Sequence, residues 1–98
     1  MKLLIIEDSA SLRRSLRIGL ANLGFAVDDT GDGAQGLSMA MTGEYELIIL
    51  DIMLPSIDGI TLLQTIRTKQ LDSKVLILSA KQEPEDRVLG LLTGAEII

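Results

Sequence analysis

Short apolar runs without polar alternation recur along the chain and predict buried strands. They cover residues 3–6, residues 47–50 within a predicted strand of residues 45–50, and residues 75–78. Such runs are typical of parallel sheets, whose strands are covered by helices on both faces. A weaker run, residues 25–27, leads into two aspartates and predicts a strand nearer an edge of the sheet. Ile97 and Ile98 predict the start of a fifth strand.

Between these runs, apolar residues recur three and four positions apart, which predicts helices. The three clearest stripes are Leu12, Leu16, Leu20 and Leu23; Ala34, Leu37 and Met41; and Ile60, Leu62, Leu63 and Ile66. Ser9 is a suitable N-cap for the first helix, which Gly24 ends, and the second helix follows Asp32. Pro84 opens a fourth helix, which closes at Gly94. This alternation predicts an α/β fold, a doubly wound parallel sheet with right-handed crossovers.

The composition narrows the range of functions. Ninety-eight residues fit one domain, residues 1–98, with no second domain. A net charge of −5 offers no basic surface for nucleic acid, so contact with DNA would need another part of the protein. Because cysteine and histidine are absent, chemistry must rest on carboxylates, hydroxyls, lysines or arginines. The first apolar run is too short for a signal peptide or a membrane span, so we expect a cytoplasmic protein without membrane contact.

Polar residues follow three of the predicted strands. Glu7 and Asp8 come after the first strand, Asp51 after the third and Ser79 after the fourth. Ligands of open parallel sheets bind outside the carboxyl ends of the strands, so these residues should converge. At about 4 Å, each pair of carboxylates would repel by roughly 4 kcal/mol at an effective dielectric constant near 20. An all-oxygen cluster of this kind favours a hard cation, Mg²⁺ above all, and predicts phosphoryl transfer to a carboxylate nucleophile.

Each of these residues also has a simpler interpretation. Acids at strand ends often do no more than solvate a loop, and a serine after a strand is commonly a turn residue. The combination is much harder to explain in that way, because two adjacent acids, a third acid and a hydroxyl are expected at one edge of one sheet.

The chain resembles a known protein family. The segments that carry the resemblance are Glu7-Asp8; Asp51-Ile52-Met53-Leu54-Pro55 with Asp58-Gly59; and Ser79-Ala80-Lys81. They are similar to the signature segments of response-regulator receiver domains, and the similarity covers the whole chain in order and spacing. The resemblance implies a flavodoxin-like receiver fold with the strand order 2-1-3-4-5.

The resemblance also implies a role for each site residue. Asp51 is the expected phosphoacceptor, which takes a phosphoryl group from the phosphohistidine of a sensor histidine kinase. Asp8 and Asp51 are expected to coordinate Mg²⁺ directly, Glu7 through a bound water, and Met53 through its backbone carbonyl. Ser79 is expected to hydrogen-bond the phosphoryl group and to report its arrival. Such a domain is not an enzyme, beyond self-catalysed phosphorylation and dephosphorylation.

Residues 85–87 and 90–95 are most similar to the subgroup of receivers that precede a winged-helix DNA-binding domain. This similarity implies control of transcription, a homodimer formed on phosphorylation, and DNA contact only through an output domain absent from this chain. The alternative is a stand-alone receiver or a pseudo-receiver that acts by protein–protein interaction.

Two features of the family lie beyond Ile98. The family places a lysine and a switch aromatic at its fifth strand, and Lys81 is in the wrong position to be that lysine. By this resemblance, most of the fifth strand and the last helix are also expected beyond Ile98. A sheet of this type buries each strand on both faces. We therefore expect either that the natural protein continues past Ile98 or that the open edge is covered by another chain.

Two other functions fit the sequence less well. Residues 31–36 match the G-x-G-x-x-G expression of dinucleotide-binding proteins, but Asp32 places a carboxylate where a pyrophosphate would bind. A turn before the second helix explains these glycines better. A magnesium phosphatase with an aspartyl nucleophile would need a second aspartate two residues after Asp51, and that residue is Met53.

Overall fold

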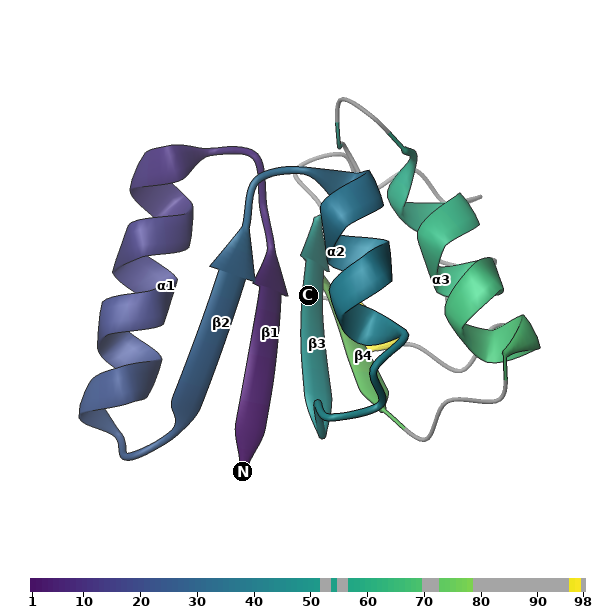
Figure 1. Ribbon diagram of the computed structural model, residues 1–98. Coiled ribbons are helices and arrows are strands. Elements are labelled where there is room, and N and C mark those ends of the chain that lie inside the picture. Colours follow the sequence, from purple (N-terminus) through teal and green to yellow (C-terminus); the bar gives the residue numbers. More distant parts are fainter. Residues whose placement is uncertain (52–53, 55–56, 70–72, 79–95, 98) are drawn as a thin grey trace.

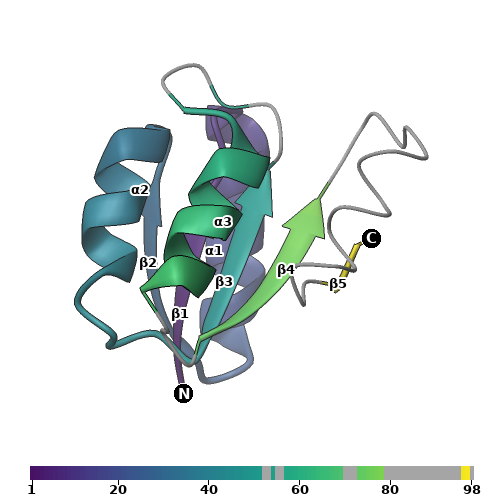
Figure 2. The ribbon, with the colours of Figure 1, turned by 90° about the vertical axis from the view of Figure 1, so that its right-hand side faces the viewer.

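Five parallel strands form one sheet in the order β2-β1-β3-β4-β5, which confirms the predicted topology (Figures 1 and 2). The structure, a computed structural model, describes residues 1–51, 54, 57–69, 73–78 and 96–97. The elements are β1 (Lys2–Ile6), α1 (Ala10–Asn22), β2 (Ala26–Thr30), α2 (Gly33–Ala40), β3 (Leu47–Asp51), α3 (Gly59–Thr68), β4 (Lys74–Leu78) and β5 (Glu96–Ile97).

The helices cover both faces of the sheet, with α2 and α3 on one face and α1 on the other (Figures 1 and 2). Each of these helices begins at an N-cap whose side chain accepts a hydrogen bond from a backbone N–H of the first turn. The caps are Ser9, Asp32 and Asp58. These side chains accept hydrogen bonds from N–H groups that have no partner within the helix. Gly24, with φ of 96°, takes the left-handed conformation after α1 and turns the chain back towards β2.

The hydrophobic core lies between the sheet and the α2–α3 layer. Its largest members have almost no exposed surface, and each contributes roughly 1.5–3 kcal/mol by burial. They are Leu4, Ile6, Ile48, Leu50, Leu62, Leu63, Ile66 and Ile77. These residues include three of the four in the predicted stripe of the third helix, and they hold β1 and β3 side by side in the middle of the sheet.

The apolar stripe predicted for the first helix is less buried than expected. Leu16 and Leu20 are half-buried, but Leu12 is 43% and Leu23 is 74% exposed. Leu12 lies in the first turn, and Leu23 follows the last helical residue as its C-cap. No residue of α1 is buried, although the helix contacts β1 and β2.

The buried face of α2 also differs from the prediction. Ala34 is exposed, whereas Gly33, Gly36 and Ala40 are buried. At Gly36, a Cβ would lie 2.6 Å from the Cδ1 atom of Ile6, so the helix approaches β1 too closely for a side chain. Apolar periodicity alone does not identify glycine as the residue that faces the core.

Strand β2 is longer than the predicted run of residues 25–27. It includes Asp28 and Asp29, which pair with Leu4 and Ile5 of β1. Charged residues usually disfavour strands. Here both aspartates have partners from neighbouring elements, among them Lys2 for Asp28 and Arg13 for Asp29, so the strand continues through them. The predicted helix of residues 84–94 lies outside the described residues.

Candidate functional site

Three acidic side chains meet at the carboxyl edge of the sheet, as the sequence predicted. Glu7 and Asp8 follow β1, and Asp51 is the last residue of β3. Strands β1 and β3 are hydrogen-bonded neighbours in register, with Ile6 opposite Leu50. One carboxylate oxygen from each of the three acids lies within 4.8 Å of the others. We call Glu7, Asp8 and Asp51 the carboxyl-edge cluster.

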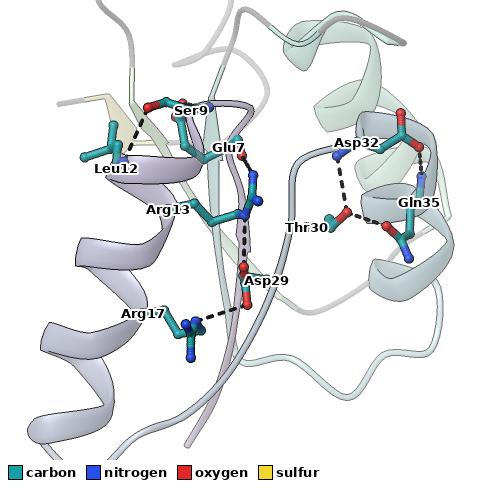
Figure 3. A network of polar contacts seen from close by, with 9 residues as sticks. All are labelled: Glu7, Ser9, Leu12, Arg13, Arg17, Asp29, Thr30, Asp32 and Gln35. Atoms are coloured by element: carbon teal, nitrogen blue, oxygen red, sulfur yellow. Dashed lines mark hydrogen bonds and ion pairs between the residues drawn. The ribbon is translucent and has the colours of Figure 1, made fainter.

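The local backbone fixes Glu7 firmly. Its N–H donates to the carbonyl of Thr30 at 3.1 Å, which extends the pairing of β1 with β2 beyond the strand end. Its carboxylate Oε1 accepts the N–H of Ser9 at 3.0 Å. Ser9 then caps α1 by accepting the N–H of Leu12 (3.3 Å; Figure 3). The turn from strand to helix therefore sets the direction in which the Glu7 carboxylate points.

The three acids differ in their access to water. Glu7 is buried, Asp51 is half-buried and Asp8 is exposed. Burial raises the pKa of Glu7 from 4.5 to about 7, and the nearby Asp51 and Asp8 carboxylates add to this effect, while the Ser9 N–H opposes it. Without a metal ion, the raised pKa favours protonated Glu7 below about pH 7.

The donor set fits a hard divalent cation. Three carboxylate oxygens of differing exposure converge on one point, and oxygen ligands of this kind suit Mg²⁺, which keeps several waters. A cation at this point would favour the ionised form of Glu7 and relieve the repulsion among the three carboxylates. Asp51 is the last residue of the central strand β3, and one of its carboxylate oxygens lies within 4.8 Å of both other acids.

Other predicted site residues lie outside the described residues. Ser79 and Met53 are among them, and so are Pro55 and Lys81. Their expected roles therefore stay predictions.

The turn before α2 confirms the simpler interpretation of its glycines. The side chain of Asp32 accepts the N–H of Gln35 at 2.9 Å, so a carboxylate already occupies the helix N-terminus (Figure 3). Thr30 donates from Oγ1 to Oε1 of Gln35 at 2.6 Å and accepts the N–H of Asp32 at 3.2 Å. This local network holds the turn without a bound pyrophosphate.

A basic contact behind the cluster was not predicted. Arg13 of α1 donates from Nη1 to the backbone carbonyl of Glu7 at 2.8 Å and from Nε to Asp29 at 2.9 Å (Figure 3). In the sequence, Arg13 lies off the apolar stripe of its helix and resembles a solvated residue. Only the crossover from β1 through α1 to β2 brings Arg13, Glu7 and Asp29 together.

Comparison with known proteins identifies the family. Residues 3–98 match the family described as response regulator receiver domain. The match covers nearly the whole chain, so the chain belongs to this family. Receiver domains accept a phosphoryl group and bind Mg²⁺ through acidic residues, and the carboxyl-edge cluster supplies such residues.

Individual relatives agree with this assignment. The transcriptional regulatory protein QseB of Haemophilus influenzae is 42% identical over 96 residues, which are 98% of this chain and 43% of the relative. The chain thus spans less than half the length of this relative. The receiver domain of Francisella response regulator 1452 superposes with a TM-score of 0.92 at 28% identity, covering 99% of this chain and 81% of that one.

A third relative was solved with a ligand. The response regulator TrrA of Thermotoga maritima, in complex with Mg(2+)-BeF, superposes with a TM-score of 0.88 at 28% identity, over 99% of this chain and 84% of that one.

Within the described part of the chain, no helix is both long and apolar enough to cross a membrane.

Proposed function

We propose that Asp51 is the phosphoacceptor of this receiver domain and that Mg²⁺ bound by the carboxyl-edge cluster is required for its phosphorylation. The observation that carries the proposal is the meeting of Glu7, Asp8 and Asp51 within 4.8 Å at the end of two neighbouring strands. The raised pKa of Glu7 supports it, because acids with perturbed pKa values at the carboxyl edge of a parallel sheet are candidates for functional sites.

The proposed step is a displacement at phosphorus. A carboxylate oxygen of Asp51 attacks the phosphoryl group of a phosphohistidine on a sensor histidine kinase, and a P–O bond forms as the P–N bond breaks. The electron pair of the P–N bond passes to the imidazole nitrogen, which takes up a proton. Asp51 becomes an acyl phosphate, and attack by water later restores the carboxylate and releases inorganic phosphate.

Four groups of the chain would hold the metal. They are the side chains of Asp8 and Asp51, Glu7 through a water molecule, and the backbone carbonyl of Met53. When bound, Mg²⁺ neutralises the charge of the acids and of the incoming phosphoryl oxygens. The oxygen donor set supports this ion, as does the relative TrrA, which was solved with Mg(2+)-BeF.

The remaining parts of the proposal concern the signal. Ser79 hydrogen-bonds the phosphoryl oxygen and passes the change to a two-state element of the domain. The phosphorylated protein forms a homodimer and controls transcription through an output domain outside residues 1–98, in the cytoplasm. The name of the QseB relative, a transcriptional regulatory protein, supports this output. Turnover is limited to self-catalysed phosphorylation and dephosphorylation.

Phosphoryl incorporation tests the proposal. The protein is incubated with acetyl phosphate, with Mg²⁺ or with EDTA, and its intact mass is measured. We expect one added phosphoryl group with Mg²⁺ and none with EDTA. Asp51→Asn should abolish the gain, whereas Asp28→Asn, the same substitution on β2, should keep it. Equal incorporation by Asp51→Asn would rule out the assignment, and incorporation in EDTA would rule out the role of the metal.

A further inference from the structure

Arg13 links α1 to the carbonyl group that precedes Asp8. Its Nη1 donates to the backbone oxygen of Glu7 at 2.8 Å, and its Nε donates to Asp29 Oδ2 at 2.9 Å (Figure 3). The Arg13 side chain is only 23% exposed. The planar guanidinium thus binds two acceptors at once, one on each side of the strand–helix crossover, which a lysine could not do with the same geometry.

The Glu7 carbonyl lies at a sensitive position. Strand β1 ends at Ile6, so Glu7 is the first residue outside the strand. Its oxygen belongs to the peptide group that joins Glu7 to Asp8, and rotation of this planar group would move both side chains relative to Asp51. With the N–H of Glu7 held by Thr30 and its carboxylate held by Ser9, the contact with Arg13 completes the fixation of this residue.

Gly31 provides the space for this contact. A Cβ at position 31 would lie 2.5 Å from Nη1 of Arg13 and 3.3 Å from its Cζ, but 3.6 Å from the Glu7 carbonyl oxygen. A methyl group would therefore displace the guanidinium and still be compatible with the backbone of Glu7. The space that the Arg13 guanidinium needs therefore explains a glycine at position 31 without a bound dinucleotide.

Arg17 offers an internal comparison. It lies one helical turn after Arg13 and reaches the other oxygen of Asp29, Oδ1, at 3.5 Å. Figure 3 shows it beside Asp29 on the side away from Glu7. Arg17 has the same charge as Arg13 and also pairs with Asp29. Of the two, Arg13 is the one that donates to the Glu7 carbonyl.

We propose that Arg13 is a positioning residue of the Mg²⁺ site: its hydrogen bond to the Glu7 carbonyl fixes the Glu7–Asp8 peptide so that both carboxylates face Asp51. This inference rests on the proposed function, because it assigns Arg13 a role in the same metal site. Groups that orient metal ligands typically change metal affinity 10–100-fold when they are removed.

The test compares Mg²⁺ affinity, measured by isothermal titration calorimetry, in the wild type and four variants. Arg13→Ala should weaken Mg²⁺ binding about tenfold or more. Gly31→Ala, which keeps the charge and displaces the guanidinium, should weaken it as well. Arg13→Lys should fall below the wild type. Arg17→Ala, the matched control, should stay within about twofold. Unchanged affinity in Arg13→Ala would overturn the proposal. An equal loss in Arg17→Ala with none in Gly31→Ala would overturn it too, because the hydrogen bond to the Glu7 carbonyl would then not explain the loss.

A second readout needs no metal. The Ser9 amide donates to the Glu7 carboxylate, so its hydrogen exchange reports whether Glu7 is held in place. In metal-free protein, exchange should be faster in Arg13→Ala and Gly31→Ala than in Arg17→Ala. If the wild type fails to bind Mg²⁺, the proposed function fails on that result alone. Exchange at Ser9 that is the same in all variants would overturn the positioning role. Gly31→Ala also keeps the test decisive if Arg13→Ala does not fold.

Discussion

Acidic side chains lie towards both edges of the sheet, in different surroundings. Towards the amino edge, Asp28 accepts the hydroxyl hydrogen of Tyr45 at 2.6 Å and lies 3.5 Å from the Lys2 ammonium, which in turn binds Glu44 at 2.9 Å. We call Lys2, Asp28, Glu44 and Tyr45 the amino-edge cluster. In the carboxyl-edge cluster, by contrast, acids gather around one another.

The two clusters differ in whether their acids are paired with a cation of the protein. In the amino-edge cluster, the Lys2 ammonium lies beside both acids, Asp28 and Glu44. Burial and the hydrogen bond to Asp28 raise the pKa of Tyr45 to about 12, so its hydroxyl stays a donor. In the carboxyl-edge cluster, burial and neighbouring acids raise the pKa of Glu7 to about 7. The fold thus keeps a repulsive group of acids at the edge where parallel sheets bind ligands, and a cation would relieve the repulsion.

The largest effect should come from removing the charge of Glu7 in metal-free protein. Since the folded-state pKa is raised, folded protein binds more protons than unfolded protein between pH 4.5 and about 7, so its free energy of unfolding falls as the pH rises through this window. A shift from 4.5 to about 7 corresponds to about 3 kcal/mol. Glu7→Gln resembles protonated Glu7 at every pH and should be more stable than the wild type by up to that amount above pH 7.

Denaturant unfolding in EDTA at pH 4 to 8 measures this difference. Glu46→Gln, at an exposed glutamate before β3, is the control and should show no comparable gain. A constant difference between Glu7→Gln and the wild type across the pH range would mean that burial and the neighbouring acids do not raise the pKa of Glu7.

Asp8→Asn should separate metal binding from folding. Losing one carboxylate ligand should weaken Mg²⁺ binding by about tenfold or more, while relief of repulsion should raise the melting temperature of metal-free protein. Calorimetric titration and a thermal melt in EDTA measure the two effects. The matched substitution Asp28→Asn should leave Mg²⁺ affinity unchanged. A metal-free melt that shows marked destabilisation by Asp8→Asn would contradict the proposed cluster.

Tyr45→Phe should give the smallest effect, and only on stability. The variant loses the hydroxyl bond to Asp28 and keeps the buried ring, so we expect a loss of roughly 1–2 kcal/mol in the free energy of unfolding. Chemical denaturation measures the loss, and Mg²⁺ affinity should equal that of the wild type. A change in Mg²⁺ affinity would show that the two clusters are coupled through the sheet.

Much of the fold follows from local pattern. Apolar runs such as residues 3–6 must be buried on both faces, and the carboxyl ends of parallel strands must share an edge, so the meeting of Glu7, Asp8 and Asp51 could be predicted without coordinates. The contact of Arg13 with Glu7 could not. It depends on how closely α1 crosses the strand ends, which the residue types alone do not encode.

The length of strand β2 is a second feature that the sequence pattern does not predict. The sequence predicts that the strand ends before Asp28 and Asp29, because charged residues disfavour strand interiors. Their partners, which include Lys2 and Arg13, come from other elements and offset that preference. Gly36 was missed for a similar reason, since its burial reflects close approach to Ile6 and not hydrophobicity.

The position of the phosphoryl group tests the central claim most directly. Protein treated with acetyl phosphate and Mg²⁺ is reduced with sodium borohydride, which converts an acyl phosphate on aspartate into the corresponding alcohol, and is then digested and sequenced by mass spectrometry. If Asp51 is the phosphoacceptor, the reduced residue will be found at position 51, and EDTA will prevent its formation. Reduction at another acidic residue, with position 51 unmodified, would contradict the assignment.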